Sequence, residues 1–233
     1  MKKIGIFVEG QTDRIFVVKF LSEYLGGEHK FSRLERKFKN KNRDEFITKR
    51  IYPEAKYFIL IFDSSGDGNV LPALYERAEN MIQNQNFEYL IALEDLYNRP
   101  RNKKKLIISK FEERIKVFRF HDRLRFVLAI MELESWFLAD ANVFSRINNI
   151  LTPEYIHEKI NINLLAINPE SLPHPAETIN KIYKLLDQSY KKTKDQAYQI
   201  TERLDFDFIC SDETLAKVKS LKFFINNINE SLE

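Results

Sequence analysis

The segment Lys3-Ile-Gly-Ile-Phe-Val-Glu-Gly-Gln-Thr-Asp13 decides the fold of this chain. The apolar run from Ile6 to Val8 predicts a short buried strand that ends at Glu9. A glycine then marks a tight turn, and Thr12 stands where the N-cap of a helix is expected. Apolar residues between Ile15 and Leu25 recur with a period near 3.6, which predicts that helix. A strand, a turn and a helix in this order are typical of an open α/β sheet.

Glu9 has two interpretations at this point. In open α/β sheets, ligands bind at the carboxyl ends of the strands, so a carboxylate here fits a functional site. A charged residue in the same place also fits the point at which a strand simply leaves the core. The spacing alone leaves both open.

The composition indicates a globular protein with a large core. The chain has 233 residues, of which 44% are hydrophobic and 30% are charged. The net charge of +3 is too small to predict nucleic-acid binding by itself. The single cysteine, Cys210, excludes an intrachain disulfide and a paired-cysteine zinc site, and the histidines lack metal-ligand spacing.

We expect a soluble, cytoplasmic protein with no membrane partner. Met1, Lys2 and Lys3 are followed by only five residues, mostly apolar, before Glu9, which fits a strand better than a signal peptide. No apolar run approaches the roughly 20 residues that are needed to cross a bilayer.

Three further apolar runs predict buried strands, over residues 56–62, 87–93 and 124–131. Strands that are apolar on both faces are typical of a parallel sheet covered by helices. We therefore predict an α/β, Rossmann-like fold with a mostly parallel four-stranded sheet over residues 1–140. A helical C-terminal region over residues 141–233 is expected to pack on it. Helical patterns lie near residues 71–83, 153–160, 175–188, 192–204 and 212–231.

Every predicted strand ends in carboxylates. These are Glu9, Asp63, Glu94 with Asp95, and Glu132 with Glu134. Parallel strands place their carboxyl ends at one edge of a sheet, so we expect these side chains to lie together. Clustered carboxylates repel one another unless a cation neutralises them, and hard oxygen ligands select Mg²⁺, Mn²⁺ or Ca²⁺. Such sites most often act on phosphates, by orienting a water and stabilising an in-line displacement.

Two basic segments accompany the acidic strand ends, at residues 30–50 and 99–105. In the first, Phe31, Leu34 and Phe38 are interleaved with lysines and arginines. The pattern fits a solvated face of a strand and a helix, and it equally fits a surface that contacts a phosphate backbone.

The individual acids and lysines have structural interpretations as well. Glu132 and Glu134 fit first-turn acids that face the macrodipole of a helix. Asp63 and Asp67 fit turn residues. The lysines of residues 191–194 fit a solvated helix face, or a cation that stabilises developing phosphate charge.

The order of these motifs resembles the Toprim fold, which occurs in topoisomerases, primases and overcoming-lysogenization-defect (OLD) nucleases. More closely, the chain resembles a Toprim-like family of bacterial proteins that are often encoded beside AAA or ABC-type ATPases. The resemblance is carried by Val8 to Asp13, by Asp95 with Tyr97, and by Glu132 to Asp140. Similar segments follow in the tail: Asn168-Pro169-Glu170, Tyr190-Lys191-Lys192 and Ala197 to Leu204.

The resemblance implies a metal-dependent nuclease that cleaves phosphodiester bonds of DNA or RNA. In this interpretation Glu9 is the general base or a metal-linked acid, and Asp95 is a metal ligand. Glu132 and Glu134 complete the catalytic cluster, with Glu134 and Asp63 as further metal ligands. The implied cofactor is Mg²⁺ or Mn²⁺, the implied partner is a separately encoded ATPase, and the implied role is defence against phage.

One position departs from the Toprim pattern. The usual Asp-x-Asp is Asp95-Leu96-Tyr97 here, so the second acid is missing. Either Glu94, Asn98 or Asp63 replaces it, or the site is inactive. The alternative function is therefore a catalytically degenerate Toprim module that binds nucleic acid or a protein partner. A Rossmann-like enzyme for a small phosphorylated substrate is disfavoured, because the chain has no Gly-x-Gly-x-x-Gly loop.

Overall fold

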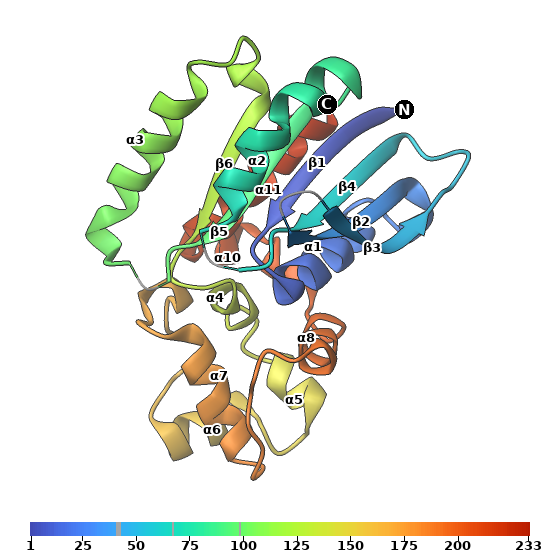
Figure 1. Cartoon of the computed structure of the whole chain (residues 1–233). Helices are drawn as coiled ribbons and strands as arrows, with labels where there is room; N and C mark the ends of the chain where they lie inside the picture. Colours follow the sequence, from blue (N-terminus) through green and yellow to red (C-terminus); the bar gives the residue numbers. More distant parts are fainter. Residues whose placement is uncertain (41–42, 67, 98) are drawn as a thin grey trace.

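The computed structural model describes residues 1–40, 43–66, 68–97 and 99–233, and it has an α/β architecture (Figure 1). Its sheet has six strands in the order β3-β2-β4-β1-β5-β6. All neighbouring strands are parallel except β2 and β3, which form an antiparallel pair at one edge. Helices cover both faces of the sheet.

The four strands predicted from the apolar runs are all present. They are β1 (Lys2–Val8), β4 (Tyr57–Asp63), β5 (Tyr89–Asp95) and β6 (Leu124–Ala129). They lie side by side in the order β4-β1-β5-β6, so β1 is central. Their interior positions are buried on both faces, as continuous apolar runs require.

The prediction of four strands is wrong in number, because the basic segment of residues 30–50 adds β2 (Phe31–Asn40) and β3 (Arg43–Arg50). The inner positions of β2 carry charge: Arg33 and Glu35 are buried and form an ion pair of 3.0 Å. Glu35 also pairs with Arg14 of the first helix. A strand that is buried through ion pairs does not produce an apolar run, which is why the sequence pattern missed it.

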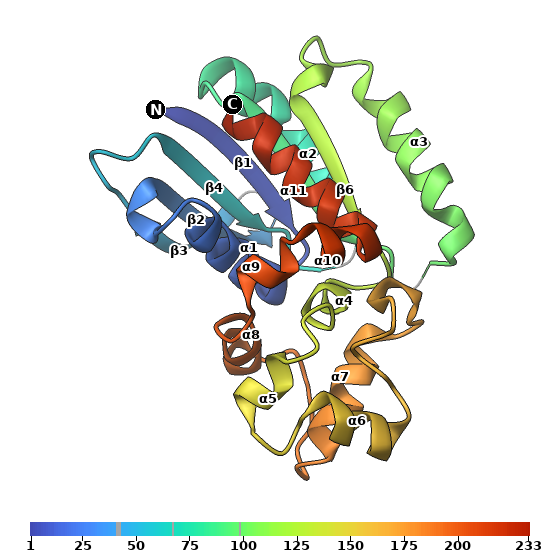
Figure 2. The same ribbon diagram turned by 180° about the vertical axis from the view of Figure 1, so that it is seen from behind.

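Two pairs of helices cover the sheet. Helices α1 (Gln11–Tyr24) and α11 (Lys219–Leu232) lie on one face, where α11 crosses β6 (Figure 2). Helices α2 (Val70–Glu79) and α3 (Lys104–Ile115) lie on the other face (Figure 1). Side chains of β1 alternate accordingly: Ile6 belongs to the core under α1, and Phe7 to the core under α2.

The remaining helices confirm a helical C-terminal region. They are α4 (Glu134–Phe137), α5 (Val143–Ile147), α6 (Pro153–Ile160), α7 (Pro175–Lys184), α8 (Lys194–Thr201), α9 (Phe206–Ile209) and α10 (Asp212–Lys217). Short 3-10 turns lie at Glu28–Lys30, Arg101–Lys103, His121–Arg123 and Pro169–Ser171, and a π-helical turn at Asn80–Asn84 extends α2. The single helix expected near residues 212–231 is divided into α10 and α11.

The helical region shares the core of the sheet. The fully buried Trp136 of α4 packs between Phe16 of α1 and Phe224 of α11, with ring centroids 5.5 and 5.4 Å away. Helices α4 to α7 lie beyond the carboxyl ends of the strands (Figure 1). A boundary at residue 140 stays a prediction. Within the described residues, no helix has the length and apolar character that a membrane crossing requires.

The path of the chain through the sheet creates a switch point beside β1. From β1 the chain moves to β2 and β3 at one edge and returns to β4, which is one neighbour of β1. It then crosses to β5, the other neighbour, and continues outward to β6. Ligands of open α/β sheets bind outside the carboxyl ends of the strands at such a reversal. The topology therefore singles out the ends of β1 and β5.

Candidate active site

A cavity of about 630 Å³ opens at the carboxyl edge of the sheet, around the ends of β1, β4 and β5. Six carboxylates line it: Glu9, Asp13, Asp63, Asp95, Glu132 and Glu134. Three basic side chains also line it, namely Lys37, Arg99 and Lys192. The expected gathering of Glu9, Asp63, Asp95, Glu132 and Glu134 at one edge is thus observed, while their catalytic and metal-binding roles stay predictions.

Glu9 and Asp95 connect the two strands of the switch point. Glu9 Oε1 accepts a hydrogen bond from the backbone N–H of Asp95 at 3.1 Å. Asp95 Oδ1 accepts one from the N–H of Leu133 at 2.9 Å. These bonds join the ends of β1 and β5 to the segment that follows β6, so the two carboxylates are held by backbone rather than by mobile side chains.

Asp63 ends β4 and lies opposite Val8 of β1 in the register of the sheet. Its Oδ1 accepts a hydrogen bond from the N–H of Ser65 at 2.9 Å, which is the turn interaction that the sequence allows. Ser65 has a φ of 60°, so this turn includes a residue in the left-handed conformation. Asp63 also lines the cavity, so its turn interaction is compatible with a role in the site, which stays a prediction. Asp67 lies outside the described residues.

Asp13 is a member of the cluster that the sequence analysis did not assign. The expectation that Thr12 caps the first helix is wrong, because α1 begins at Gln11 and its N-cap is Gly10. The N–H of Gly10 donates to Asp13 Oδ2 at 2.8 Å. An acid three residues after the N-cap is the reciprocal half of a capping box, and this spacing was the available signal. The same bond turns the carboxylate of Asp13 toward the cavity.

Glu132 and Glu134 share one cation. Lys192 Nζ lies 3.0 Å from Glu132 Oε1 and 3.0 Å from Glu134 Oε2. Glu132 Oε2 accepts a further bond from the N–H of Ala176 at 2.9 Å, and Glu134 Oε1 accepts one from Tyr190 Oη–H at 3.0 Å. Of the lysines in residues 191–194, therefore, Lys192 is the one that reaches the site.

Lys37 and Arg99 stand at the rim. Lys37 of β2 lies opposite Asp63 in the register of β2 and β4, and Arg99 follows β5. Arg99 forms an ion pair with Glu94, which is buried and does not line the cavity. Of the three residues considered as replacements for the missing second acid, Asp63 lines the cavity, Glu94 does not, and Asn98 lies outside the described residues. Tyr97, at the position of that acid, is exposed at the rim.

The electrostatics of the cavity are those of an acid cluster with too little positive charge. Burial raises the pKa of Asp95 well above its usual value, and the charges of Asp13, Glu9 and Glu134 raise it further. Burial and the charge of Glu134 raise the pKa of Asp13 to about 7. Burial also raises the pKa of Asp63.

Lys192 shows the opposite balance. Burial alone would lower its pKa, but Glu134, Glu132 and Asp95 outweigh that cost and raise it. Its carboxylate neighbours thus favour the charged form of Lys192. Burial and the adjacent Glu134 also raise the pKa of Tyr190 well above its usual value, so its hydroxyl stays a donor.

A hard divalent cation fits the donor chemistry of this cavity. Glu9, Asp13, Asp63 and Asp95 offer carboxylate oxygens of the kind that Mg²⁺ and Mn²⁺ prefer, and a cation would offset the burial and the neighbouring negative charges that raise the pKa values of Asp13 and Asp95. In the described parts of the chain, no three of the Asp, Glu, His and Cys side chains converge closely enough to hold a metal as they stand. Lys192 already lies between Glu132 and Glu134.

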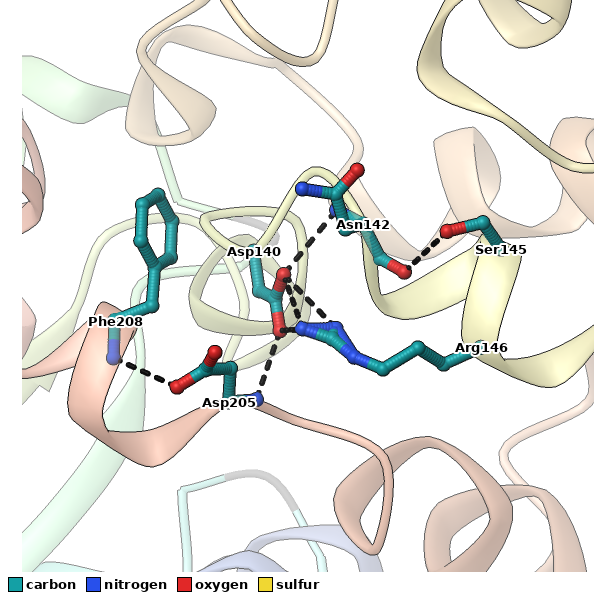
Figure 3. A network of polar contacts seen from close by, with 6 residues as sticks. All are labelled: Asp140, Asn142, Ser145, Arg146, Asp205 and Phe208. Atoms are coloured by element: carbon teal, nitrogen blue, oxygen red, sulfur yellow. Dashed lines mark hydrogen bonds and ion pairs between the residues drawn. The ribbon is translucent and has the colours of Figure 1, made fainter.

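Two motif acids of the helical region lie away from the cavity. Asp140 accepts hydrogen bonds from the N–H of Asp205 at 2.9 Å and of Asn142 at 3.2 Å, and it pairs with Arg146 at 2.8 Å (Figure 3). Glu170 accepts bonds from the N–H of Ser220 at 2.7 Å and from the Ser220 hydroxyl at 2.5 Å. Both carboxylates tie chain segments together.

Comparison with known proteins identifies a family but not an activity. Neither the curated proteins nor the solved structures include a match to this chain. One family model, described as "Domain of unknown function (DUF4276)", matches residues 8–215. That range contains every residue that lines the cavity, from Glu9 to Lys192. The chain therefore belongs to the family described as a domain of unknown function, DUF4276.

Proposed function

We propose that this protein is a metal-dependent nuclease of the Toprim type that hydrolyses phosphodiester bonds of DNA or RNA. One observation carries the proposal: carboxylates from the ends of β1, β4 and β5 line a single cavity at the switch point of the sheet. Such a cluster destabilises the fold unless a cation offsets it, because burial and the charges of Asp13, Glu9 and Glu134 raise the pKa of Asp95.

Glu9 and Asp95 are the residues that would hold Mg²⁺ or Mn²⁺, with Asp13 and Asp63 as the nearest further donors. The ion, when bound, supplies a Lewis acid for the phosphate and lowers the pKa of a bound water. The chain provides the alignment. The backbone bond from Asp95 to Glu9 fixes the two acids relative to each other, and the bond from Leu133 fixes Asp95.

The basic rim supports a polyanionic substrate. Lys37 and Arg99 line the cavity from the β4 side and the β5 side. Further exposed lysines and arginines continue outward on each side: Lys39 and Arg43 on one, and Arg101, Lys103 and Lys105 on the other. A nucleic acid that crosses the cavity would contact both groups with its phosphates, and such contacts supply sequence-independent affinity.

A cleavage assay tests the proposal. Labelled single- and double-stranded DNA and RNA are incubated with Mg²⁺, Mn²⁺ or a chelator, using the wild type, Glu9→Gln, Asp95→Asn and Glu112→Gln. We expect metal-dependent cleavage that falls about 100-fold or more in the first two variants. Glu112, an exposed carboxylate on α3, is the matched control and should cleave normally. Full cleavage by both Glu9→Gln and Asp95→Asn would show that the activity does not come from this cavity.

The alternative function is a degenerate module that binds nucleic acid or a protein partner without cleaving. Tyr97 in place of the second acid favours it, as does the lack of three converging ligands among the described residues. It predicts nucleic-acid binding that survives removal of the acids and no thermal shift with millimolar Mg²⁺. A metal-dependent thermal shift in the wild type that disappears in Glu9→Gln with Asp95→Asn would contradict it.

The resemblance extends the proposal to a partner and a role. We propose a separately encoded AAA or ABC-type ATPase as the partner, and defence against phage as the role. Both rest on the resemblance of the motifs. Co-purification with an ATPase encoded beside this chain, together with plaque counts for cells that carry wild type or Glu9→Gln, tests them.

A further inference from the structure

Lys192 sits where two of the cavity's carboxylates meet, and its surroundings set how many metal ions the site holds. Resting on the proposed function, we infer that Lys192 occupies the position of a second cation. The protein then binds one metal ion, on the strand-end carboxylates Glu9 and Asp95, and Glu132 and Glu134 are not metal ligands. The sequence had suggested Glu134 as a ligand.

The hydrogen bonds of Glu132 and Glu134 carry this inference. Each of their four carboxylate oxygens has a donor: Lys192 Nζ at 3.0 Å for one oxygen of each, the N–H of Ala176 for the second oxygen of Glu132, and Tyr190 Oη–H for the second oxygen of Glu134. Both glutamate side chains are almost completely buried. A metal ion at this pair would have to displace a cation that the chain itself supplies.

The backbone conformation and hydrogen bonds of its loop hold Lys192 beside Glu132 and Glu134. Lys192 has a φ of 52°, a conformation that a residue with a side chain keeps only when its surroundings impose it. On its N-terminal side, the N–H of Tyr190 donates to Asn180 of α7 at 3.0 Å. The N–H of Lys191 donates to Gln196 of α8 at 2.8 Å. These two bonds attach the loop to α7 and α8 just before Lys192, and the N–H of Thr193 donates to Gln196 at 3.4 Å just after it.

The remaining acids define where the metal ion goes. Among the described residues, no Lys or Arg nitrogen lies within 4.0 Å of the carboxylates of Asp13, Asp63 or Asp95. Two-metal sites place their ions about 3.5–4 Å apart to hold both reacting oxygens. Here a permanent ammonium takes one of those places. The side chain of Lys192 is 40% exposed and lines the cavity in which a phosphate would bind.

Metal stoichiometry tests the inference without an activity readout. Isothermal titration with Mn²⁺ is performed on the wild type, on Lys192→Met, which keeps the apolar stem, and on Lys191→Met, the neighbouring exposed lysine. We expect about one ion per chain in the wild type and in Lys191→Met, and about two in Lys192→Met. The triple variant Lys192→Met, Glu132→Gln, Glu134→Gln should return to about one.

A second measurement applies if Lys192→Met does not fold, as judged by circular dichroism. Glu134→Gln alone should keep the wild-type stoichiometry, whereas Glu9→Gln should lose it. Two ions in the wild type, one ion in a folded Lys192→Met, or loss of the ion in Glu134→Gln would each overturn the role of Lys192 and leave the metal-dependent function intact. No ion in any variant would instead overturn the proposed function.

Discussion

Buried carboxylates occur in two regions of this protein, and their partners differ. In the helical region, Asp140 and Glu170 are surrounded by donors from the backbone, a guanidinium and a hydroxyl. At the edge of the sheet, Glu9, Asp13 and Asp95 lie beside other carboxylates. The first group joins segments that are far apart in the sequence, and the second group faces a cavity.

The groups that shift the pKa values of Asp140 and Asp95 differ in the same way. Burial raises the pKa of Asp140, while Arg146 and the N–H groups of Asp205 and Asn142 oppose that rise. Burial also raises the pKa of Asp95, but there Asp13, Glu9 and Glu134 add to the rise. Most neighbours of Asp140 stabilise its charge, whereas most neighbours of Asp95 destabilise its charge. Glu132 and Glu134 are intermediate, because Lys192 compensates them from within the chain.

Replacement of Asp140 is the strongest test of this comparison. Asp140→Ala should lower the free energy of unfolding by about 2–4 kcal/mol, because it removes the partner of Arg146 and leaves the N–H of Asp205 without its acceptor. Urea denaturation measures the change. Glu158→Ala, at an exposed ion pair, is the control and should change the same quantity by less than about 1 kcal/mol. Equal effects for the two variants would remove the structural assignment of Asp140.

Glu170 should show a smaller loss. Glu170→Gln should lower the free energy of unfolding by about 1–2 kcal/mol, because the amide keeps one acceptor for Ser220 but loses the charge-assisted bonds. The Ser220 hydroxyl also accepts from Trp136 Nε1 at 2.9 Å, and Trp136 is the only tryptophan. We therefore expect a change in its emission spectrum. An unchanged spectrum together with unchanged stability would contradict the assignment.

Replacement of Asp13 should change the free energy of unfolding in the opposite direction to replacement of Asp140 or Glu170. In metal-free protein at pH 8, Asp13→Asn should raise the free energy of unfolding by about 1 kcal/mol, because it removes a buried charge that Glu134 repels. The amide oxygen can still accept from the N–H of Gly10. Thermal unfolding in a chelator measures the effect. A loss as large as that of Asp140→Ala would place Asp13 with the structural acids.

The pH dependence of stability tests whether Asp13 titrates as a cavity acid. Asp13 has a pKa of about 7 in the folded protein against 3.8 for the ordinary carboxyl, so the folded state binds this proton more tightly. Its contribution to stability is present at low pH and is lost as the pH rises from about 4 to about 7. The difference in stability between Asp13→Asn and the wild type should therefore grow over this window in a chelator. A difference that stays constant with pH would show that Asp13 titrates normally.

The sequence predicted the part of the fold that depends on local, apolar patterns. The apolar runs before Glu9, Asp63 and Asp95 are buried on both faces. The sequence therefore identifies them as strands without knowledge of the strands beside them. Parallel pairing then brings their carboxyl ends to one edge. The gathering of Glu9, Asp63, Asp95, Glu132 and Glu134 at that edge followed from the positions of the strands, whereas the presence of Asp13 did not.

The tertiary structure decided what depends on partners that are distant in the sequence. Strand β2 is buried with Arg33 and Glu35 neutralised by ion pairs, which no periodicity reveals, and β3 pairs with it. Asp13 entered the cluster through its bond to Gly10.

Asp140, Glu170 and Glu134 look alike in the sequence, since each is an acid in a motif. Their different environments come from donors that the chain brings from afar: Asp205, Ser220 and Lys192, respectively. A carboxylate becomes structural or available to a ligand according to the charges and N–H groups that surround it. Only the folded chain places those groups, because they lie tens of residues away.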